Sequence, residues 1–312
     1  MKNIKEEIRR MCREKNAVIM AHYYTDGEIQ DMADFVGDSL ALAQKAATTD
    51  ADIIVMCGVH FMGETSKILC PDKKVLVPDL EATCSLAESC PADKFAEFVA
   101  EHPGHTVISY VNTTAATKAV TDIVVTSSNA REIVESLPQD TPIIFGPDRN
   151  LGGYINSITG RNMLLWDGAC HVHEKFSVEK IIELKNQYPD AKVLVHPECK
   201  GAVVKLADKV GSTAALLKYS INDSSDIFIV ATESGILHEM QKACPEKTFI
   251  PAPPSDSTCA CNECSYMKLV TMQKLYDCLK NEAPEIHVDA EVAEKAIVSI
   301  NRMLEISEKL GL

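Results

Sequence analysis

Hydrophobic and polar positions repeat one pattern three times along the chain. Each copy begins with a short, nearly continuous apolar run that ends in polar residues: VIMAHYY (18–24), VISYVNT (107–113) and VLVHPEC (193–199). A helical stretch follows, and then a second landmark: ADFVGDS (33–39), TDIVVTSS (121–128) or ADKVGST (207–213). The pattern predicts a buried strand followed by a helix in every copy.

The spacing inside the copies is the same. In each copy an aspartate lies 12 residues, and a hydroxyl residue 17 residues, after the first polar residue. These triplets are His22, Asp34 and Ser39; Tyr110, Asp122 and Ser127; and His196, Asp208 and Thr213. Threefold recurrence of two intervals indicates an internal repeat of supersecondary structure.

Each copy continues with a second apolar strand, a helix and a third strand. The second strands are predicted in 51–58, 141–147 and 225–232, and the third in 74–84, 162–170 and 247–264. Every third-strand segment ends in a cysteine, namely Cys84, Cys170 or Cys264. These cysteines are 86 and 94 residues apart, close to the 88 and 86 residues between His22, Tyr110 and His196, so the repeat is about 86 residues long.

The apolar runs predict parallel sheets covered by helices on both faces. Helical periodicity in 39–49, 128–137 and 211–220 supplies such covers. We therefore expect an α/β fold of three pseudo-symmetric, three-layer α-β-α (Rossmann-like) domains around a central active site. The predicted domains are 1–84, 85–170 and 171–264, with C-terminal helices in 265–312 packing back on the first repeat. Ligands of such folds bind beyond the carboxyl ends of the strands.

Charge and composition exclude several classes of protein. With 31 Lys and Arg against 45 Asp and Glu, the formal charge is −14, which disfavours a nucleic-acid partner. The longest apolar runs, such as 53–59, are far shorter than the roughly 20 residues of a membrane helix, so no membrane partner is expected. The charged N-terminal segment lacks the apolar core of a signal peptide, which predicts a cytoplasmic protein whose 12 cysteines are thiols.

The polar residues at the predicted strand ends are acids, bases and hydrogen-bonding groups. They are His22, Tyr24, Tyr110, Asn112, His196 and Glu198. Groups of this kind serve carbon–carbon bond formation and dehydration of an enolisable substrate. Ser39, Ser127 and Thr213 are predicted to open helices, where a hydroxyl and free N–H groups can hold a carboxylate or phosphate, or cap the helix.

Three cysteines delivered by three repeats to one centre suit a soft metal site with an open coordination position. Cysteine-only ligation over wide sequence separations favours a [4Fe–4S] cluster with three protein ligands, and a catalytic zinc remains the alternative. Cys259, Cys261 and Cys264 also resemble half of a zinc knuckle or a redox pair, and a Cys261–Cys264 disulfide that switches activity is a further hypothesis. His171 and His173 are more typical of a helix start than of metal ligands.

The chain resembles quinolinate synthase, the A protein of bacterial NAD biosynthesis, over nearly its whole length. The segments that carry the resemblance are AHYY, GDSLALAQKA, FMGET, YVNTTAATKA, VVTSSNA, FGPDRNLG, WDGACHVHE, HPEC, VGST and CNECSYM, in family order. The resemblance implies a transferase or dehydratase-type enzyme that makes quinolinate from iminoaspartate and dihydroxyacetone phosphate, with loss of two waters and phosphate. It also implies three similar α-β-α domains and, as a candidate partner, the L-aspartate oxidase that produces iminoaspartate.

The resemblance also implies roles for individual residues. Cys84, Cys170 and Cys264 would hold a [4Fe–4S] cluster with one open iron. Tyr24 and Glu198 would transfer protons, with His22 and His196 as further catalytic residues. The implied substrate contacts are His22, Ser39, Tyr110, Asn112, Ser127, His196, Glu198 and Thr213. Two other readings remain open: another [4Fe–4S] hydro-lyase, and a zinc-stabilised α/β protein that binds a small anion.

Overall fold

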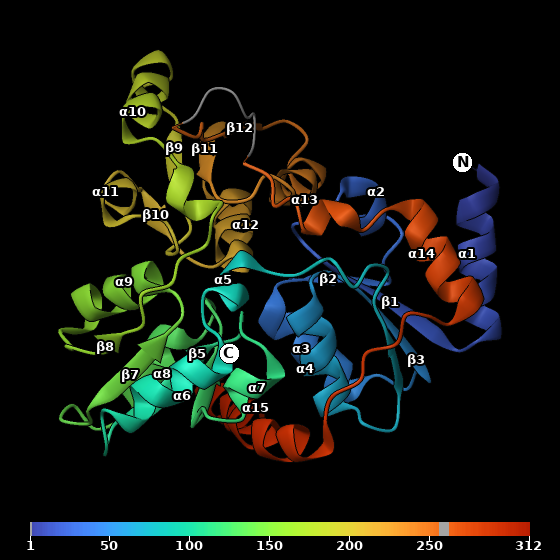
Figure 1. Ribbon diagram of the computed structural model, residues 1–312. Coiled ribbons are helices and arrows are strands. Elements are labelled where there is room, and N and C mark those ends of the chain that lie inside the picture. The colour runs from blue at the N-terminus through green and yellow to red at the C-terminus, as the bar shows by residue number, and fades with distance from the viewer. Residues whose placement is uncertain (1, 256–261) are drawn as a thin grey trace.

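The chain forms three parallel four-stranded sheets, each flanked by helices (Figure 1). The computed structural model describes residues 2–255 and 262–312. The strand orders are β2-β1-β3-β4, β6-β5-β7-β8 and β10-β9-β11-β12, so every sheet has the same topology. The predicted α/β fold of three similar layered units is confirmed.

Within each sheet the strands come from one contiguous stretch of chain. The strands are β1 (Ala17–His22), β2 (Phe35–Gly37), β3 (Ile53–Cys57) and β4 (Lys74–Leu76); β5 (Thr106–Tyr110), β6 (Ile123–Val125), β7 (Ile143–Gly146) and β8 (Leu164–Leu165); and β9 (Lys192–Val195), β10 (Lys209–Val210), β11 (Ile227–Ala231) and β12 (Thr248–Pro251). The strand-bearing ranges are thus 17–76, 106–165 and 192–251. The domain bounds at 84 and 170 fall between these ranges, the bound at 264 follows the last of them, and all three stay a prediction.

Helices precede each sheet and fill the crossovers between its parallel strands. In the first unit they are α1 (Lys2–Glu14), α2 (Gly27–Gln30), α3 (Ser39–Thr48) and α4 (His60–Leu69), and in the second α5 (Ser85–Glu88), α6 (Ala92–Ala100), α7 (Ala115–Lys118), α8 (Ala130–Ser136) and α9 (Arg149–Thr159). The third has the 3₁₀ helix η1 (His173–Lys175), α10 (Val178–Gln187), α11 (Gly201–Val204), α12 (Thr213–Asn222) and α13 (Ile236–Ala243). The chain ends with η2 (Met267–Leu269), α14 (Met272–Asn281) and α15 (Ala290–Leu310).

Burial of both sheet faces explains why the strands read as continuous apolar runs. All residues of β3, β6 and β7 are buried, as expected for parallel sheets covered by helices on both sides. The first and second sheets contribute to one core cluster, which includes Ile54, Ile108 and Phe145. The third sheet has its own apolar clusters on either face.

Each unit has one strand more than the sequence pattern predicted. The second landmarks of the repeat contain β2, β6 and β10, which are two or three residues long. The helices ahead of them, α2, α7 and α11, are single turns. Such short strands carry too few residues to show a period, and only their place in the repeat marks them.

The two C-terminal helices pack against different units. Helix α14 lies beside α1, and Leu275 and Leu279 share a core cluster with Ile8 and Met11 (Figure 1). Helix α15 instead packs against α7, β6, α8 and α4, where Ile300 is fully buried. The tail was expected on the first repeat, but most contacts of α15 are with the second, because its apolar face covers the edge strand β6. None of the helices in residues 2–255 and 262–312 is long and apolar enough to cross a bilayer.

Candidate active site

A cavity lies where the carboxyl ends of the three sheets meet. All twelve side chains that the sequence reasoning selected line this cavity: His22, Tyr24, Ser39, Cys84, Tyr110, Asn112, Ser127, Cys170, His196, Glu198, Thr213 and Cys264. The lining also contains residues that it did not select: Asp38, Val59, Phe61, Met62, Thr126, Val172, His173, Glu233 and Met267. The repeat thus brings together residues that lie up to 242 positions apart, from His22 to Cys264.

The same backbone turn follows the first strand of the first and third sheets, and a side-chain hydrogen bond closes the corresponding turn of the second. After β1, the N–H of Thr25 donates to the carbonyl of His22 at 3.0 Å, and after β9 the N–H of Cys199 donates to that of His196 at 3.0 Å. After β5, the Thr113 hydroxyl donates to the carbonyl of Tyr110 at 3.1 Å. The residues at the three strand ends line one cavity.

Glu198 is a buried anion at this centre. Tyr110 donates its hydroxyl to Oε1 at 2.6 Å, His173 Nδ1 lies 3.3 Å from Oε2, and His196 Nδ1 lies 3.5 Å from Oε1. Burial opposes ionisation, but the charge of His173, and after it His196 and the Tyr110 hydroxyl, lower the pKa of Glu198. The carboxylate can therefore accept a proton from a substrate.

His196 connects Glu198 to Ser127. Its Nε2 lies 3.2 Å from the Ser127 hydroxyl, while the N–H of Glu198 donates to Nδ1 at 3.4 Å. Burial lowers the pKa of His196 to about 3, so the imidazole is neutral. With Nδ1 accepting, Nε2 carries the proton and donates to Ser127. Because the backbone N–H of Glu198 occupies Nδ1, His196 orients the Ser127 hydroxyl and does not share a proton with the Glu198 carboxylate.

Tyr24 is a protonated phenol held between two hydroxyl groups. Its oxygen lies 2.9 Å from Thr213 Oγ1 and 2.7 Å from Thr232 Oγ1. Burial, and after it the charge of Glu198, raise the pKa of Tyr24 well above its usual value. The neighbouring His22 has a pKa lowered to about 3 by burial and packs edge-on against Tyr24. The phenol is therefore a proton donor rather than a base.

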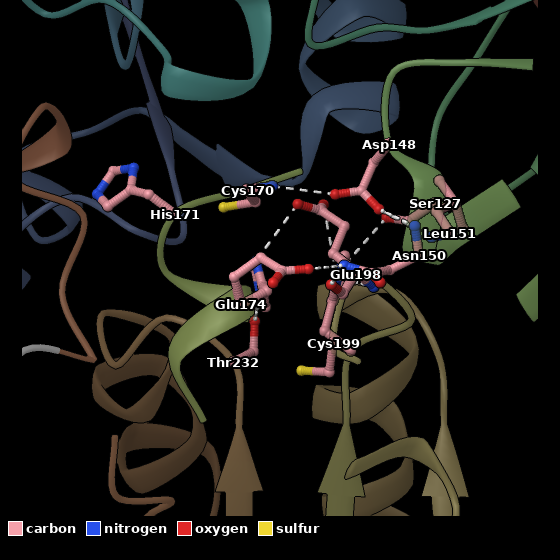
Figure 2. A network of polar contacts seen from close by, with 12 residues as sticks. Ser127, Asp148, Asn150, Leu151, Cys170, His171, Glu174, Glu198, Cys199 and Thr232 are labelled. Atoms are coloured by element: carbon pink, nitrogen blue, oxygen red, sulfur yellow. Dashed lines mark hydrogen bonds and ion pairs between the residues drawn. The ribbon is translucent and has the colours of Figure 1, made fainter. Parts of the chain in front are cut away.

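A chain of polar contacts joins Tyr24 to Glu198. It runs from Tyr24 to Thr232, from Thr232 Oγ1 to His173 Nε2 at 2.9 Å, and from His173 Nδ1 to Glu198. Figure 2 shows Glu198 in the middle of the surrounding polar contacts, with Thr232 on one side and Ser127 and Asp148 on the other. Sequence reasoning assigned His173 to a helix start, and it does begin η1, but its ring also lines the cavity. Nothing in the sequence marked Thr232.

The hydroxyl residues at the helix starts face the cavity because neighbouring residues cap the helices. Ser39 and Thr213 are the first residues of α3 and α12, but Asp38 and Ser212 accept the capping hydrogen bonds, from Ala41 and Ala215. The third hydroxyl residue differs from the expectation, because α8 begins only at residue 130 and Ser127 lies in the turn ahead of it. A hydroxyl that does not cap its helix remains available to an anion in the cavity.

Asn112 adds a polar group without a protein partner. Its Oδ1 is buried and makes no hydrogen bond within the described residues. A buried amide oxygen without a partner costs free energy unless a ligand satisfies it. Its position in the lining therefore indicates a contact to a bound substrate.

Each of the three cysteines stands immediately ahead of a helical turn. Cys84 precedes α5, Cys170 precedes η1 and Cys264 precedes η2, and each carbonyl accepts from the N–H four residues on. The N–H groups two and three residues beyond each cysteine bond to the thiol and lower its pKa. Thiols at helix N-termini are stabilised as thiolates in this way.

Burial nevertheless keeps these thiols protonated in the absence of a cation. It raises the pKa of Cys84 to about 12, and it raises those of Cys170 and Cys264 as well. The charge of Cys264 also raises the pKa of Cys84, and the charge of Cys84 raises that of Cys170. The three thiols are therefore close enough to influence one another's ionisation. A bound metal would supply the missing positive charge.

The spacing of the sulfur atoms bears on which metal fits. Within the part of the chain that the structure describes, the three sulfurs do not form a group whose atoms all lie within 4.8 Å of one another. Two bonds of roughly 2.3 Å to a single zinc span at most about 4.6 Å, so one zinc does not reach all three as they stand. Cys170, His173 and Glu198 do form such a group and could hold a single ion. Cys259 and Cys261, and with them the hypothesis of a Cys261–Cys264 disulfide, lie outside the described residues.

Comparisons with known proteins agree with the resemblance seen in the sequence. A family model described as Quinolinate synthetase A protein matches residues 6–305. The chain is 58% identical over 300 residues to the quinolinate synthase of Thermosynechococcus vestitus, an alignment that covers 96% of this chain and 94% of the relative. Identity to the quinolinate synthase of a Synechococcus species is 57% over 295 residues (95% and 92%), and to that of Chloroherpeton thalassium it is 55% over 303 residues (97% and 94%).

Proposed function

The chain belongs to the Quinolinate synthetase A protein family, and from that premise we propose that it is a quinolinate synthase of NAD biosynthesis. The proposed reaction condenses iminoaspartate with dihydroxyacetone phosphate to quinolinate, with loss of two waters and inorganic phosphate. We propose L-aspartate oxidase as the source of iminoaspartate. The observation that carries the proposal is that all twelve predicted site residues, from three sheets, line one cavity.

The reaction asks the protein to hold anions and to move protons. Precursors and products balance without an external oxidant or reductant. Ser39, Ser127 and Thr213, with the unpartnered amide oxygen of Asn112, can bind carboxylate, phosphate and amine groups of the two substrates. The hydroxyl groups at the starts of α3 and α12 also lie at the positive ends of their helices, which favours anions.

Proton transfer falls to Glu198 and Tyr24 in this proposal. The ionised Glu198 takes a proton from the carbon or nitrogen that isomerises, and the protonated Tyr24 donates to a leaving hydroxyl. His196 and His22 are neutral and orient these groups, and His173, which lies between Thr232 and Glu198, helps to position both.

We propose that Cys84, Cys170 and Cys264 hold a [4Fe–4S] cluster with one iron open. The donor set supports this assignment: three partly buried thiols, each ahead of a helical turn, whose sulfurs are too far apart for one zinc as they stand. When bound, the cluster would supply a Lewis-acidic iron that polarises a substrate hydroxyl. The aliphatic and aromatic side chains of Val59, Phe61, Met62 and Met267 would limit water around it.

The proposal is tested by metal analysis after strictly anaerobic purification, followed by an assay for quinolinate. About four iron and four sulfide per chain, with quinolinate formed from the two proposed substrates, would support it. Zinc near one per chain without sulfide would instead support the zinc-stabilised binding protein. A loaded cluster without quinolinate formation would favour a different hydro-lyase, which screening other hydroxy acids would identify.

A further inference from the structure

Two buried carboxylates occupy the same position in the second and third repeats. Asp148 lies two residues after β7 and Glu233 lies two residues after β11, and both are 0% exposed. Each accepts a hydrogen bond from the backbone N–H of a proposed ligand cysteine: Cys170 donates to Asp148 Oδ2 at 3.1 Å, and Cys264 donates to Glu233 Oε1 at 3.0 Å. Figure 2 shows Asp148 reaching Cys170 across the network.

Both oxygens of each carboxylate are occupied. Asp148 Oδ1 accepts from the N–H groups of Asn150 and Leu151 at 2.7 and 2.9 Å, which caps α9, while Oδ2 serves Cys170. Glu233 Oε2 accepts from the N–H of Gly235 at 2.7 Å, while Oε1 serves Cys264. An amide has one acceptor oxygen, so asparagine or glutamine could satisfy only one side of either arrangement.

The Glu233 contact extends to the first sheet. Lys268 Nζ lies 3.3 Å from Glu233 Oε1 and donates to the carbonyl of Tyr24 at 3.1 Å. Gly235 lets the Glu233 carboxylate and the Tyr23 backbone lie close to its own main chain, because a Cβ there would lie 2.8 Å from Glu233 Oε2 and 2.8 Å from the Tyr23 carbonyl oxygen. Cys264 is thereby tied to the loop that carries Tyr24.

In the first repeat an apolar residue takes the equivalent position, and a backbone hydrogen bond holds the loop ahead of the cysteine. Val59 stands two residues after β3, and the N–H of His60 donates to the carbonyl of Ala82 at 2.7 Å, two residues ahead of Cys84. The Cys84 loop is thus held by its own main chain. Burying a carboxylate is costly, and an exposed aspartate such as Asp289 caps a helix equally well. Two buried acids at repeat-equivalent places therefore indicate a requirement of the cysteines rather than of the helices.

We propose that Asp148 and Glu233 are positioning residues that fix the main chain of Cys170 and Cys264, so that both thiolates face the cluster. This inference rests on the cluster in the proposed function. Residues of this kind typically change metal affinity or activity by about 10- to 100-fold when they are replaced. Loss of either carboxylate is therefore expected to loosen the cluster without removing a ligand.

The test compares wild type with Asp148→Asn and Glu233→Gln after anaerobic cluster reconstitution. The readouts are iron and sulfide per chain and the rate of iron transfer to EDTA under anaerobic conditions. Both variants should lose iron about 10-fold or more faster than wild type. Asp289→Asn is the matched control, because Asp289 Oδ1 accepts from the N–H groups of Glu291 and Val292 just as Asp148 Oδ1 accepts from two N–H groups at α9. Among the described residues, Asp289 has no hydrogen bond to a cysteine. This variant should lose iron at the wild-type rate.

Wild-type release rates in both variants would overturn the proposal, and so would equal acceleration in Asp289→Asn. Thermal unfolding of the metal-free proteins shows whether Asp148→Asn folds, and Glu233→Gln carries the test alone if it does not, since Glu233 caps no helix. Wild-type protein that takes up neither iron nor sulfide would refute the proposed function instead, which separates the two failures.

Discussion

At the residue scale, two side chains that the sequence did not identify as functional connect Tyr24 to Glu198. Thr232 and His173 complete the chain of contacts between them. The repeat identified Tyr24 and Glu198 because each lies two residues after the first polar residue of its copy, His22 or His196. Thr232 follows a different strand, β11, and its role depends on side-chain distances that the spacing does not encode.

Replacing Glu198 by glutamine tests the proton-transfer role directly. The variant keeps the volume and the Tyr110 contact but cannot accept a proton, so turnover should fall on the order of 10²- to 10⁴-fold. Iron and sulfide content should stay at the wild-type level, because Glu198 is not a proposed cluster ligand. Turnover near wild type, measured as quinolinate formed per loaded cluster, would contradict the assigned role.

Elements long enough to show a period were predictable, and the shortest were not. Helices α3, α8 and α12 and the central strands of each sheet lie where the pattern placed them. The edge strands β2, β6 and β10 were missed because two or three residues show no alternation. The amphipathic pattern identified α15 as a helix, but a single apolar face does not say which sheet it covers, and only tertiary packing decides that.

The packing of α15 makes a prediction about stability. Ile300 is fully buried against the second unit, whereas Val298 on the same helix is 64% exposed. Ile300→Ala should lower the free energy of unfolding by about 2–5 kcal/mol, and Val298→Ala should change it by less than about 0.5 kcal/mol. Chemical denaturation of both variants measures the difference, and equal effects would contradict the packing of α15 on the second unit.

At the scale of the whole molecule, burial shifts the pKa values of two histidines and of two carboxyl groups near the cavity in opposite directions. Burial lowers the pKa of His22 and His196 to about 3, and it raises those of Asp148 and Glu233 to about 7. Below pH 6.5 these histidines bind protons in the unfolded chain but stay neutral in the folded protein, so acidification lowers the free energy of unfolding. Between about pH 7 and 4 the folded carboxylates bind protons that the unfolded ones release, so acidification adds stability. The two effects oppose each other.

Replacing one buried histidine should change the pH dependence of stability. His22→Asn removes the loss of stability that His22 causes on acidification, because asparagine does not titrate. From pH 6.5 to 5 the variant should therefore lose less stability than wild type, by on the order of 1 kcal/mol per pH unit. Denaturant unfolding of the metal-free proteins at both pH values measures this, and parallel pH dependence in the two proteins would show that His22 is not buried as a neutral group.

The position of α15 also has a consequence for synthesis on the ribosome. This helix covers β6 and packs beside α8, yet 174 residues separate the end of α8 at Ser136 from the end of α15 at Leu310. At about 5–20 residues per second, translation of that stretch takes roughly 9–35 s. During this time the nascent second unit exposes the apolar surface that Ile300 and Met303 later bury. We therefore expect the second unit to finish folding only after α15 has left the ribosome.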